Sequence, residues 1–211
     1  PILYDLLFFH VLRARFMLWH LVMAGGTLLY VLFNSGLILV IKPDMASMTR
    51  YGGIYIAMGL TIVGLARFTS QVLEEGSVPP KLSAALTGAA IANLAVALVI
   101  PLDIEPLRGR IVDLYLLSVL PVIGALVAVL AIALRRRSRA AIFLAAAYGG
   151  LLIAGAAQVF ASLGSYSMAE VIDESLYVAL VVLVLGSSAA VGDRLLIIKA
   201  ERDRAQLAAK K

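Results

Sequence analysis

Five polar side chains stand in or beside apolar segments of this chain, where water would be scarce if those segments crossed a membrane. Ionisable and amide groups are costly at such depth, and they mark ligand sites, ion paths or proton relays. All five belong to one side of the predicted molecule, so they predict a polar cavity open to the outside. The alternative is a rim of carboxylates wetted by interfacial water. The candidates are Asn34, Asp113, Gln158, Asp173 and Glu174.

Two histidines and one lysine raise the question of a cofactor. His10 and His20 fall at similar depth on adjacent segments, which is the arrangement that bis-histidine haem ligation needs. Hydrogen bonding near the membrane interface, beside Trp19, is the simpler interpretation. Lys199 could hold a retinal only if it lay inside the membrane. It follows Asp193 and Arg194, which are expected outside the hydrocarbon, so no retinal is expected.

The sequence shows no catalytic constellation. It has no cysteine, which excludes disulfides and thiolate metal sites. No Ser/His/Asp set, metal-ligand cluster or phosphate-binding loop is recognisable. We therefore expect a chain that is not itself an enzyme, with no catalytic residue, no metal and no cofactor.

Composition places these residues in a membrane protein. Of the 211 residues, 62% are hydrophobic and 15% are charged, whereas soluble domains have roughly 45–50% and about 25%. The mean hydropathy is +0.99. The apolar runs show no regular alternation, so helices and not barrel strands are expected to span the bilayer. The formal charge of +5 is attributed to orientation and anionic lipid, and no nucleic-acid partner is expected.

Seven transmembrane helices are predicted, and short connections make neighbouring helices antiparallel. A span needs about 20 apolar residues, so the first segment is interpreted as the C-terminal half of a longer helix. The predicted spans are 1–12, 16–41, 54–73, 82–102, 111–134, 140–164 and 175–192.

Lysine and arginine set the expected orientation. Before residue 193, eight of them fall on the side that carries "RRRSR" (135–139) and four on the other side, and six more follow in the tail. Because basic residues are enriched in cytoplasmic loops, we expect that side to be cytoplasmic. The N-terminus then lies outside and the C-terminus inside the cell.

The last span is predicted to continue as one helix into a charged tail, "AVGDRLLIIKAERDRAQLAAKK" (190–211). Residues 1–192 are predicted to form a sensor domain, and 193–211 a helical linker resembling a coiled coil, with near-heptad spacing. Small residues in "GSSAA" (186–190) allow close helix approach or a dimer face. A solvated helix end is the alternative. The candidate signal-transmission residues are Gly186, Gly192, Asp193, Arg194, Leu195 and Ile198.

Three stretches of this sequence resemble a known family. They are "LYDLLFFHVLRARFMLWHLVMA", "ARFTSQVLEEGSVPPKL" and "LGSSAAVGDRLLIIKAERDRAQ". In spacing and apolar character they are similar to the ends of spans one, three and seven in the bacterial seven-transmembrane receptors with diverse intracellular signalling modules (7TMR-DISM).

The resemblance implies a sensor and transmitter core in the bacterial inner membrane. In that family a periplasmic ligand-binding domain often precedes the spans, and an output domain such as a histidine kinase or diguanylate cyclase follows them. Neither is recognisable here, so the output domain is expected to be missing from this chain. The expected partners are the lipid bilayer, a second copy in a homodimer through helix seven, an unidentified ligand and the output domain.

Two alternatives remain open. The first is a small transporter or channel whose path would be lined by Asn93, Asp113, Gln158 and Glu174, although no convincing inverted repeat is seen. The second is an accessory subunit of a larger membrane complex, in which the tail serves only for docking.

Overall fold

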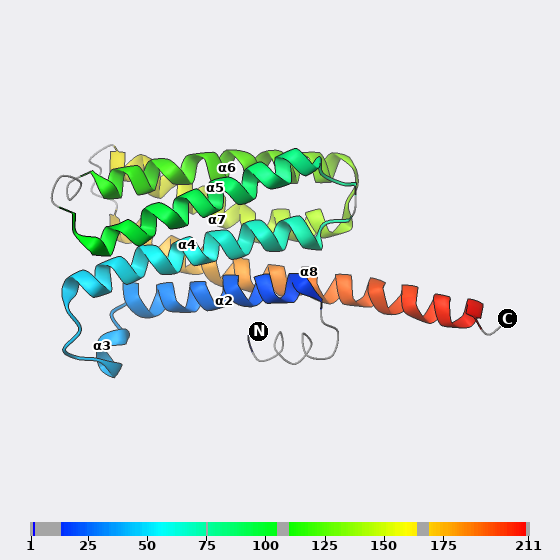
Figure 1. Cartoon of the computed structure of the whole chain (residues 1–211), viewed down its shortest axis with the longest axis horizontal. Coiled ribbons are helices and arrows are strands. Elements are labelled where there is room, and N and C mark those ends of the chain that lie inside the picture. The colour runs from blue at the N-terminus through cyan, green and yellow to red at the C-terminus, as the bar shows by residue number, and fades with distance from the viewer. Residues whose placement is uncertain (1, 3–13, 75, 105–109, 164–168, 210–211) are drawn as a thin grey trace.

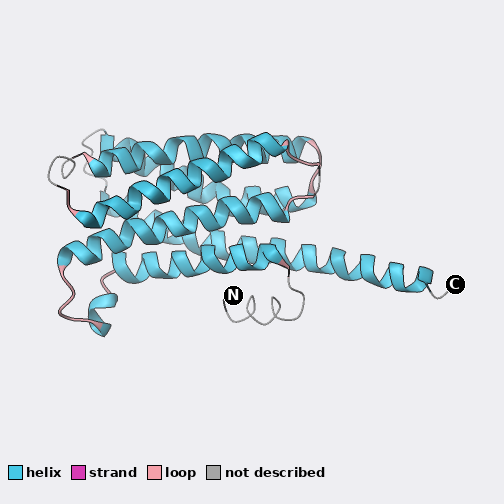
Figure 2. Ribbon diagram, in the orientation of Figure 1, coloured by secondary structure: helices cyan, strands magenta, loops and turns pink. Residues whose placement is uncertain are grey.

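Six helices in the described part of the chain are long and apolar enough to cross a membrane. The structure, a computed structural model, describes residue 2 and residues 14–74, 76–104, 110–163 and 169–209, and this part contains no strand (Figures 1 and 2). Side chains of residues 158–174, 198, 201–205 and 207–209 are not described. The six spans are α2 (Arg15–Asn34), α4 (Ser47–Val72), α5 (Pro80–Val99), α6 (Ile111–Arg135), α7 (Arg139–Leu163) and α8 (Ala169–Ala209).

The all-helical, multi-pass membrane architecture expected from composition is confirmed. A helix satisfies its own backbone hydrogen bonds, which is what the hydrocarbon core requires. Two short elements complete the described fold, α3 (Ile38–Ile41) and the 3-10 helix η1 (Ile100–Leu102). The predicted first span, 1–12, falls almost entirely outside the described residues, so the seventh helix remains a prediction.

Consecutive helices pack side by side, and the last one returns to the first. Each spanning helix contacts the next one along the chain, in the pairs α2–α4, α4–α5, α5–α6, α6–α7 and α7–α8. Helix α8 also contacts α2 and α4 (Figure 1). Among the described residues, α6 and α7 make the sparsest contact of any consecutive pair. We call the end with the 73–79 and 136–138 turns the exit end, because α8 projects there, and the opposite end the far end.

The prediction of one helix over 16–41 is wrong. Helix α2 stops at Asn34, and Gly36 adopts φ +80, the left-handed conformation that commonly ends a helix. Arg50 stabilises this ending, because its Nε donates to Phe33 O at 2.9 Å and its Nη2 to Asn34 O at 3.0 Å. These bonds satisfy carbonyls that the helix end leaves unpaired.

Proline and a left-handed residue shape α5. The helix begins at Pro80, where a missing N–H costs nothing. The α-helix ends at Val99 and passes into η1, which contains Pro101, so the span as a whole ends at Leu102 as predicted. Asp103, at φ 48, then turns the chain away. Pro121, in contrast, is accommodated inside α6.

Helix α8 is continuous over 41 residues. At 1.5 Å per residue it is about 60 Å long, roughly twice the hydrocarbon thickness of a bilayer. It passes Gly192 without interruption, so the predicted single helix from span into tail is confirmed. Its C-terminal part extends beyond the other helices (Figure 1).

Close approach between helices occurs at specific glycines. A Cβ built on Gly64 would lie 2.5 Å from the backbone N of Met23, and one on Gly26 would lie 2.7 Å from the backbone N of Thr61. These positions hold α2 against α4. A Cβ on Gly186 would lie 2.6 Å from Cβ of Ala147 and so marks the α7–α8 contact. Small residues therefore pack helices within the chain, as membrane interfaces generally use them.

Candidate functional site at the exit of helix α8

An ion pair ties α8 to the rest of the bundle where it leaves the exit end. Arg139, the first residue of α7, donates from Nη2 to Oδ1 of Asp193 at 3.0 Å. The Asp193 side chain is only 16% exposed, whereas that of Arg139 is 70% exposed. Surface pairs contribute little energy alone, so this pair acts chiefly by fixing the position of α8 against the α6–α7 turn.

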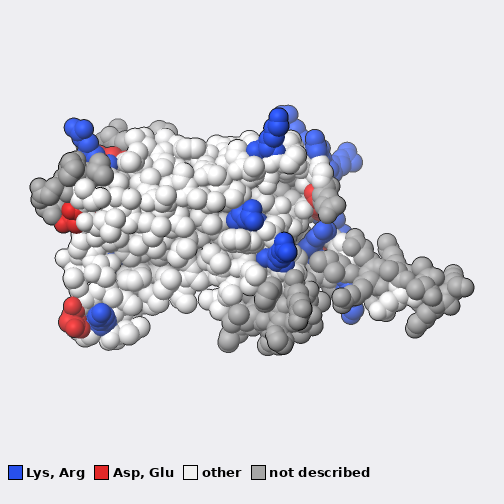
Figure 3. Space-filling view, in the orientation of Figure 1, with Lys and Arg blue, Asp and Glu red and all other residues white. Residues whose placement is uncertain are grey.

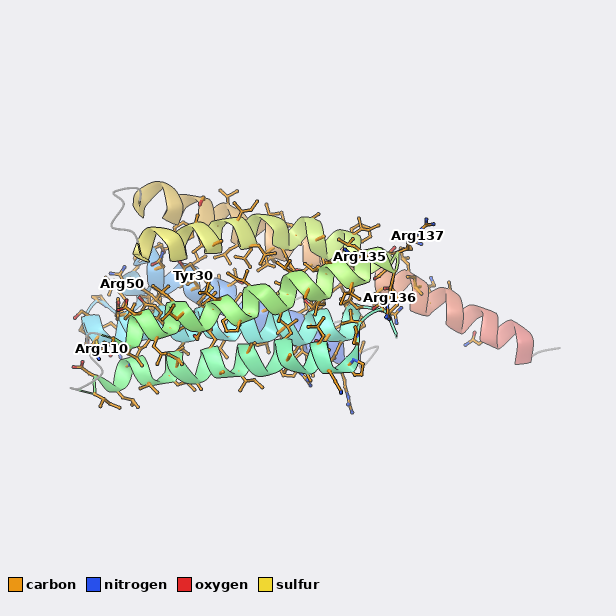
Figure 4. All side chains as sticks on the ribbon, turned by 90° about the horizontal axis from the view of Figure 1, so that it is seen from above. Tyr30, Arg50, Arg110, Arg135, Arg136 and Arg137 are labelled. Atoms are coloured by element: carbon orange, nitrogen blue, oxygen red, sulfur yellow. The ribbon has the colours of Figure 1, made fainter. Side chains whose placement is uncertain are left out.

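Glu74, in the α4–α5 turn, holds the α6–α7 turn in place. The hydroxyl of Ser138 and the backbone N–H of Ala140 both donate to the Glu74 carboxylate, the latter at 3.4 Å. Ala141 N–H donates to Ser138 Oγ at 3.2 Å, so Ser138 caps α7. Arg136, labelled in Figure 4, donates from the same turn to the carbonyl of Gly76.

The Glu74 carboxyl lies at the positive end of the α7 dipole. Burial by itself would raise its pKa. The hydrogen bonds from Ser138 and from the backbone N–H groups of Glu74, Ala140 and Arg139 outweigh burial, and the pKa is lowered below the ordinary value. The ionised carboxylate is therefore the form that the fold stabilises.

We expect Glu74→Ala to cost about 1–2 kcal/mol of unfolding free energy at neutral pH, because α7 loses a charged cap. The folded-state pKa is lowered, so this stabilisation is present above the unfolded-state pKa. It disappears as pH falls through the lower, folded-state value. Unfolding in detergent can be followed by the fluorescence of Trp19, the single tryptophan.

The matched control is Glu74→Gln, which keeps the length of the side chain and removes its charge. It should flatten the acid limb of the pH profile while retaining part of the cap. If the Glu74→Ala protein unfolds at the same detergent concentration as the native protein, and its unfolding free energy depends on pH in the same way, the cap contributes nothing to stability.

Inside the bundle, α8 is joined to α2 by a buried polar contact. His20 Nε2 lies 2.9 Å from Ser187 Oγ, and both residues are fully buried. The Ser187 hydroxyl donates to Leu183 O at 2.7 Å, so the Nε2–H of the imidazole is the donor in the contact with Ser187. The ring also packs against Phe68 with centroids 5.1 Å apart. His10 lies outside the described residues, so nothing places it opposite His20.

A second buried contact joins α4 to α7. The Tyr148 hydroxyl lies 3.0 Å from Thr69 Oγ1, and both residues are fully buried. Because Thr69 itself donates to Leu65 O at 2.7 Å, Tyr148 is the donor. Near the exit end, the Arg67 guanidinium lies over the Trp19 ring at 5.1 Å from its centroid, a cation–π contact between α4 and α2.

At the far end, α8 is joined to the end of α2. Asn34 Nδ2 donates to the Tyr177 hydroxyl at 2.7 Å. Asp113 is instead exposed in the first turn of α6. Figure 4 shows Tyr30, Arg50 and Arg110 toward this end. The side chains of Gln158, Asp173 and Glu174 lie outside the described part, so the predicted polar cavity remains a prediction.

The candidate transmission residues occupy three different settings along α8. Gly186 is in close contact with α7, and Asp193 is paired with Arg139. Leu195 packs against the core of its own chain, whereas a Cβ on Gly192 would meet nothing within 4 Å. Arg194 is half-buried, and the Ile198 side chain is not described.

Sequence reasoning missed three residues that hold α8 in place. The small-residue stretch does not distinguish Ser187 from its neighbours, and the basic run indicates only an orientation role for Arg139. The polar stretch after residue 73 predicts a loop at Glu74. A serine one residue before a new apolar run, as Ser138 is, does indicate a helix cap. Nothing local indicates which carboxylate completes it.

Asn93, in the C-terminal half of α5, is buried and donates to Ser118 Oγ at 2.8 Å. This contact joins α5 to α6, which is the packing role that asparagine often has in membrane bundles. Within the described residues, no group of three His, Cys, Asp or Glu side chains is placed to hold a metal ion.

Comparison with known proteins adds one finding. A family model described as "7TM diverse intracellular signalling" matches residues 1–194, which is nearly the whole chain. Comparisons with curated proteins and with solved structures gave no match.

Proposed function

Because this chain belongs to the 7TM diverse intracellular signalling family, we propose that it is the sensor and transmitter core of a bacterial inner-membrane receptor. A periplasmic or membrane signal changes how the helices pack. Helix α8 carries that change to a cytoplasmic output domain, such as a diguanylate cyclase or a histidine kinase. The chain itself performs no catalysis in this proposal.

The continuous helix α8 is the observation that carries the proposal. It is held at the far end by Asn34, in the interior by His20 and at the exit end by Arg139. A displacement of Tyr177 at the far end therefore reaches Asp193 through one rigid element. A signal shifts the output only by its differential affinity for two packings of the bundle.

Charge supports the proposed orientation. Figure 3 shows more Lys and Arg toward the exit end of the bundle than toward the far end. Among the described residues these include Arg67, Lys81, Arg135, Arg136 and Arg137. The positive-inside rule then favours a cytoplasmic exit end, where an output domain would meet α8.

A homodimer through α8 belongs to the same proposal. Exposed residues recur along one stripe of α8 at intervals of four, three, four and seven: Val178, Val182, Leu185, Ala189 and Leu196. This is the spacing of a coiled-coil seam. Leu195 packs on its own bundle, so the seam that we propose runs along this stripe and does not include Leu195.

The test is to fuse the chain to a diguanylate cyclase reporter and to insert one to four alanines after Arg194. Each residue rotates the following helix by about 100°, so four residues nearly restore the original phase. We expect output to change strongly with two alanines and to recover substantially with four. Reporter output is measured as cyclic dinucleotide formed in membranes.

The matched control inserts four glycines, which have the same length but weaken the helix. This variant should lose the regulated output that four alanines retain. Equal output from all insertions, including the glycines, would contradict transmission through a continuous helix.

A further inference from the structure

A cavity of about 430 Å³ lies at the far end, between the start of α4, the turn that follows α5 and the start of α6. Its volume falls within the range of about 300–1,000 Å³ that is usual for small-molecule sites. Two lining residues are polar: Tyr51, which is 41% exposed, and Asp103, which is half-buried. The apolar lining residues are Met48, Val99, Ile100, Ile104, Ile111 and Val112.

Asp103 is the one charged residue in the described part of this lining. Its left-handed conformation, at φ 48, turns the chain after η1, and its backbone N–H donates to Ile100 O at 3.4 Å. A carboxylate has acceptor positions for about four hydrogen bonds, so Asp103 can bind a ligand in addition to its contacts within the chain. Arg110 precedes Ile111 but is exposed and does not line the cavity. The charge of the lining therefore favours a cation and repels an anion.

Tyr51 adds a second group that attracts a cation. The Tyr55 hydroxyl donates to the Tyr51 hydroxyl at 3.0 Å, and the two rings pack edge to face with centroids 5.0 Å apart. These contacts hold the Tyr51 side chain in the lining of the cavity. A tyrosine ring attracts an ammonium group that lies over its face, and a carboxylate forms a charge-assisted hydrogen bond with the same group.

We propose that this cavity binds a small organic amine. Its protonated amino group lies against the Asp103 carboxylate and the Tyr51 ring, and its apolar body contacts the aliphatic side chains of the lining. A metal cation fits less well, because Ca²⁺ and Mg²⁺ require about six oxygen ligands, and only two of the eight described lining side chains carry oxygen. The apolar lining instead favours a ligand that has carbon to bury.

A ligand in this cavity would contact both α4 and α6. Tyr51 packs against Tyr55, also on α4, and Tyr55 packs against Tyr115 of α6 with centroids 4.9 Å apart. The row of three rings thus leads from the cavity to the contact between the two helices. A bound amine therefore favours the packing of α4 and α6 that keeps both walls of the cavity in place. The identification of the amine as a signal rests on the proposed function, whereas its binding does not.

The experiment uses the purified chain in phosphatidylcholine nanodiscs, with 2-phenylethylamine as the probe. Binding is measured by isothermal titration calorimetry at neutral pH, and the heat from empty nanodiscs is subtracted. We expect saturable binding at one site per chain. The comparison compound, 2-phenylethanol, has a hydroxyl in place of the ammonium group and should bind at least tenfold more weakly. Equal affinity for the two compounds, or no saturable binding above that of empty nanodiscs, would overturn the proposal.

Two variants and one control locate the binding site. Asp103→Asn removes the charge but keeps the shape, and asparagine also tolerates the left-handed conformation, so affinity for 2-phenylethylamine should fall at least tenfold. Tyr51→Leu should weaken it about two- to fivefold, because the cation–π attraction is lost. Asp44→Asn removes the same charge from an exposed position outside the lining and should change affinity less than about twofold.

Unchanged affinity in Asp103→Asn would show that this carboxylate is not the anchor. Equal losses in Asp103→Asn and Asp44→Asn would show that the amine responds only to the surface charge of the far end. Detergent unfolding followed by Trp19 fluorescence confirms that each variant is folded. Calorimetry needs no output domain, so amine binding can fail while phase-dependent output persists, or succeed while that output is absent. The two proposals are thus tested separately.

Discussion

A Gly64→Ala variant is expected to lose about 3 kcal/mol of unfolding free energy, at the upper end of the usual cost of overpacking. The added Cβ would lie 2.5 Å from the backbone N and 2.7 Å from Cα of Met23. Backbone atoms of a packed helix cannot turn aside as a flexible side chain does. Helices α2 and α4 must therefore move apart. This movement also weakens the contact between Trp19 and Arg67.

The measurement is SDS-induced unfolding in mixed micelles, followed by Trp19 fluorescence. Gly88→Ala in α5 is the matched control, since a Cβ there meets nothing within 4 Å. It should be neutral or stabilising by up to about 1 kcal/mol, because alanine is the better helix former. A Gly64→Ala protein as stable as Gly88→Ala would mean that α2 and α4 do not approach as closely as described.

The second large effect is expected at Gly186, where α8 touches α7. In Gly186→Ala the new Cβ would lie 2.6 Å from Cβ of Ala147 and 3.1 Å from its Cα. We expect a loss of about 2 kcal/mol. Since Ser187 follows directly, displacement of α8 also lengthens the His20–Ser187 hydrogen bond, and basal output of the reporter fusion should change.

The double variant Gly186→Ala/Ala147→Gly separates this clash from general damage. Moving the methyl group from α7 to α8 removes the 2.6 Å contact. Ala147→Gly alone should cost about 1 kcal/mol from helix propensity. The double variant should be more stable than the sum of the single effects predicts, by at least about 1 kcal/mol of coupling. Strict additivity would show that these two positions are not in contact.

Local sequence patterns predict some contacts of the candidate site and not others. The small-residue stretch around Gly186 and the uninterrupted run from Leu176 through Asp193 pointed correctly to a close helix contact and to one continuous helix. The pairing of Asp193 with Arg139 was not accessible. Both residues looked like surface charges in sequence, and only the rotation of α7 against α8 brings them within 3.0 Å.

Composition and local sequence patterns were enough to assign the membrane class, the helical architecture and the family. These depend on apolar runs of sufficient length, because each span satisfies its own backbone in lipid whatever its neighbours do. The boundaries of six spans follow largely from the same rule, and so does the helix that continues past Gly192. The end predicted at residue 41 is an exception, because Gly36 and Arg50 end α2 at Asn34.

Which side chains meet could be learned only from the packing of the helices. Arg50 ends α2 from 17 residues away, Glu74 caps α7 across 66 residues, and Ser187 meets His20 across 167. Such pairs depend on how each helix is rotated and how closely it approaches its neighbours. Glycine contacts such as Gly64 against Met23 set that approach. Inside a bilayer, apolar faces toward lipid and toward protein look alike in sequence, so hydropathy carries no information about that rotation.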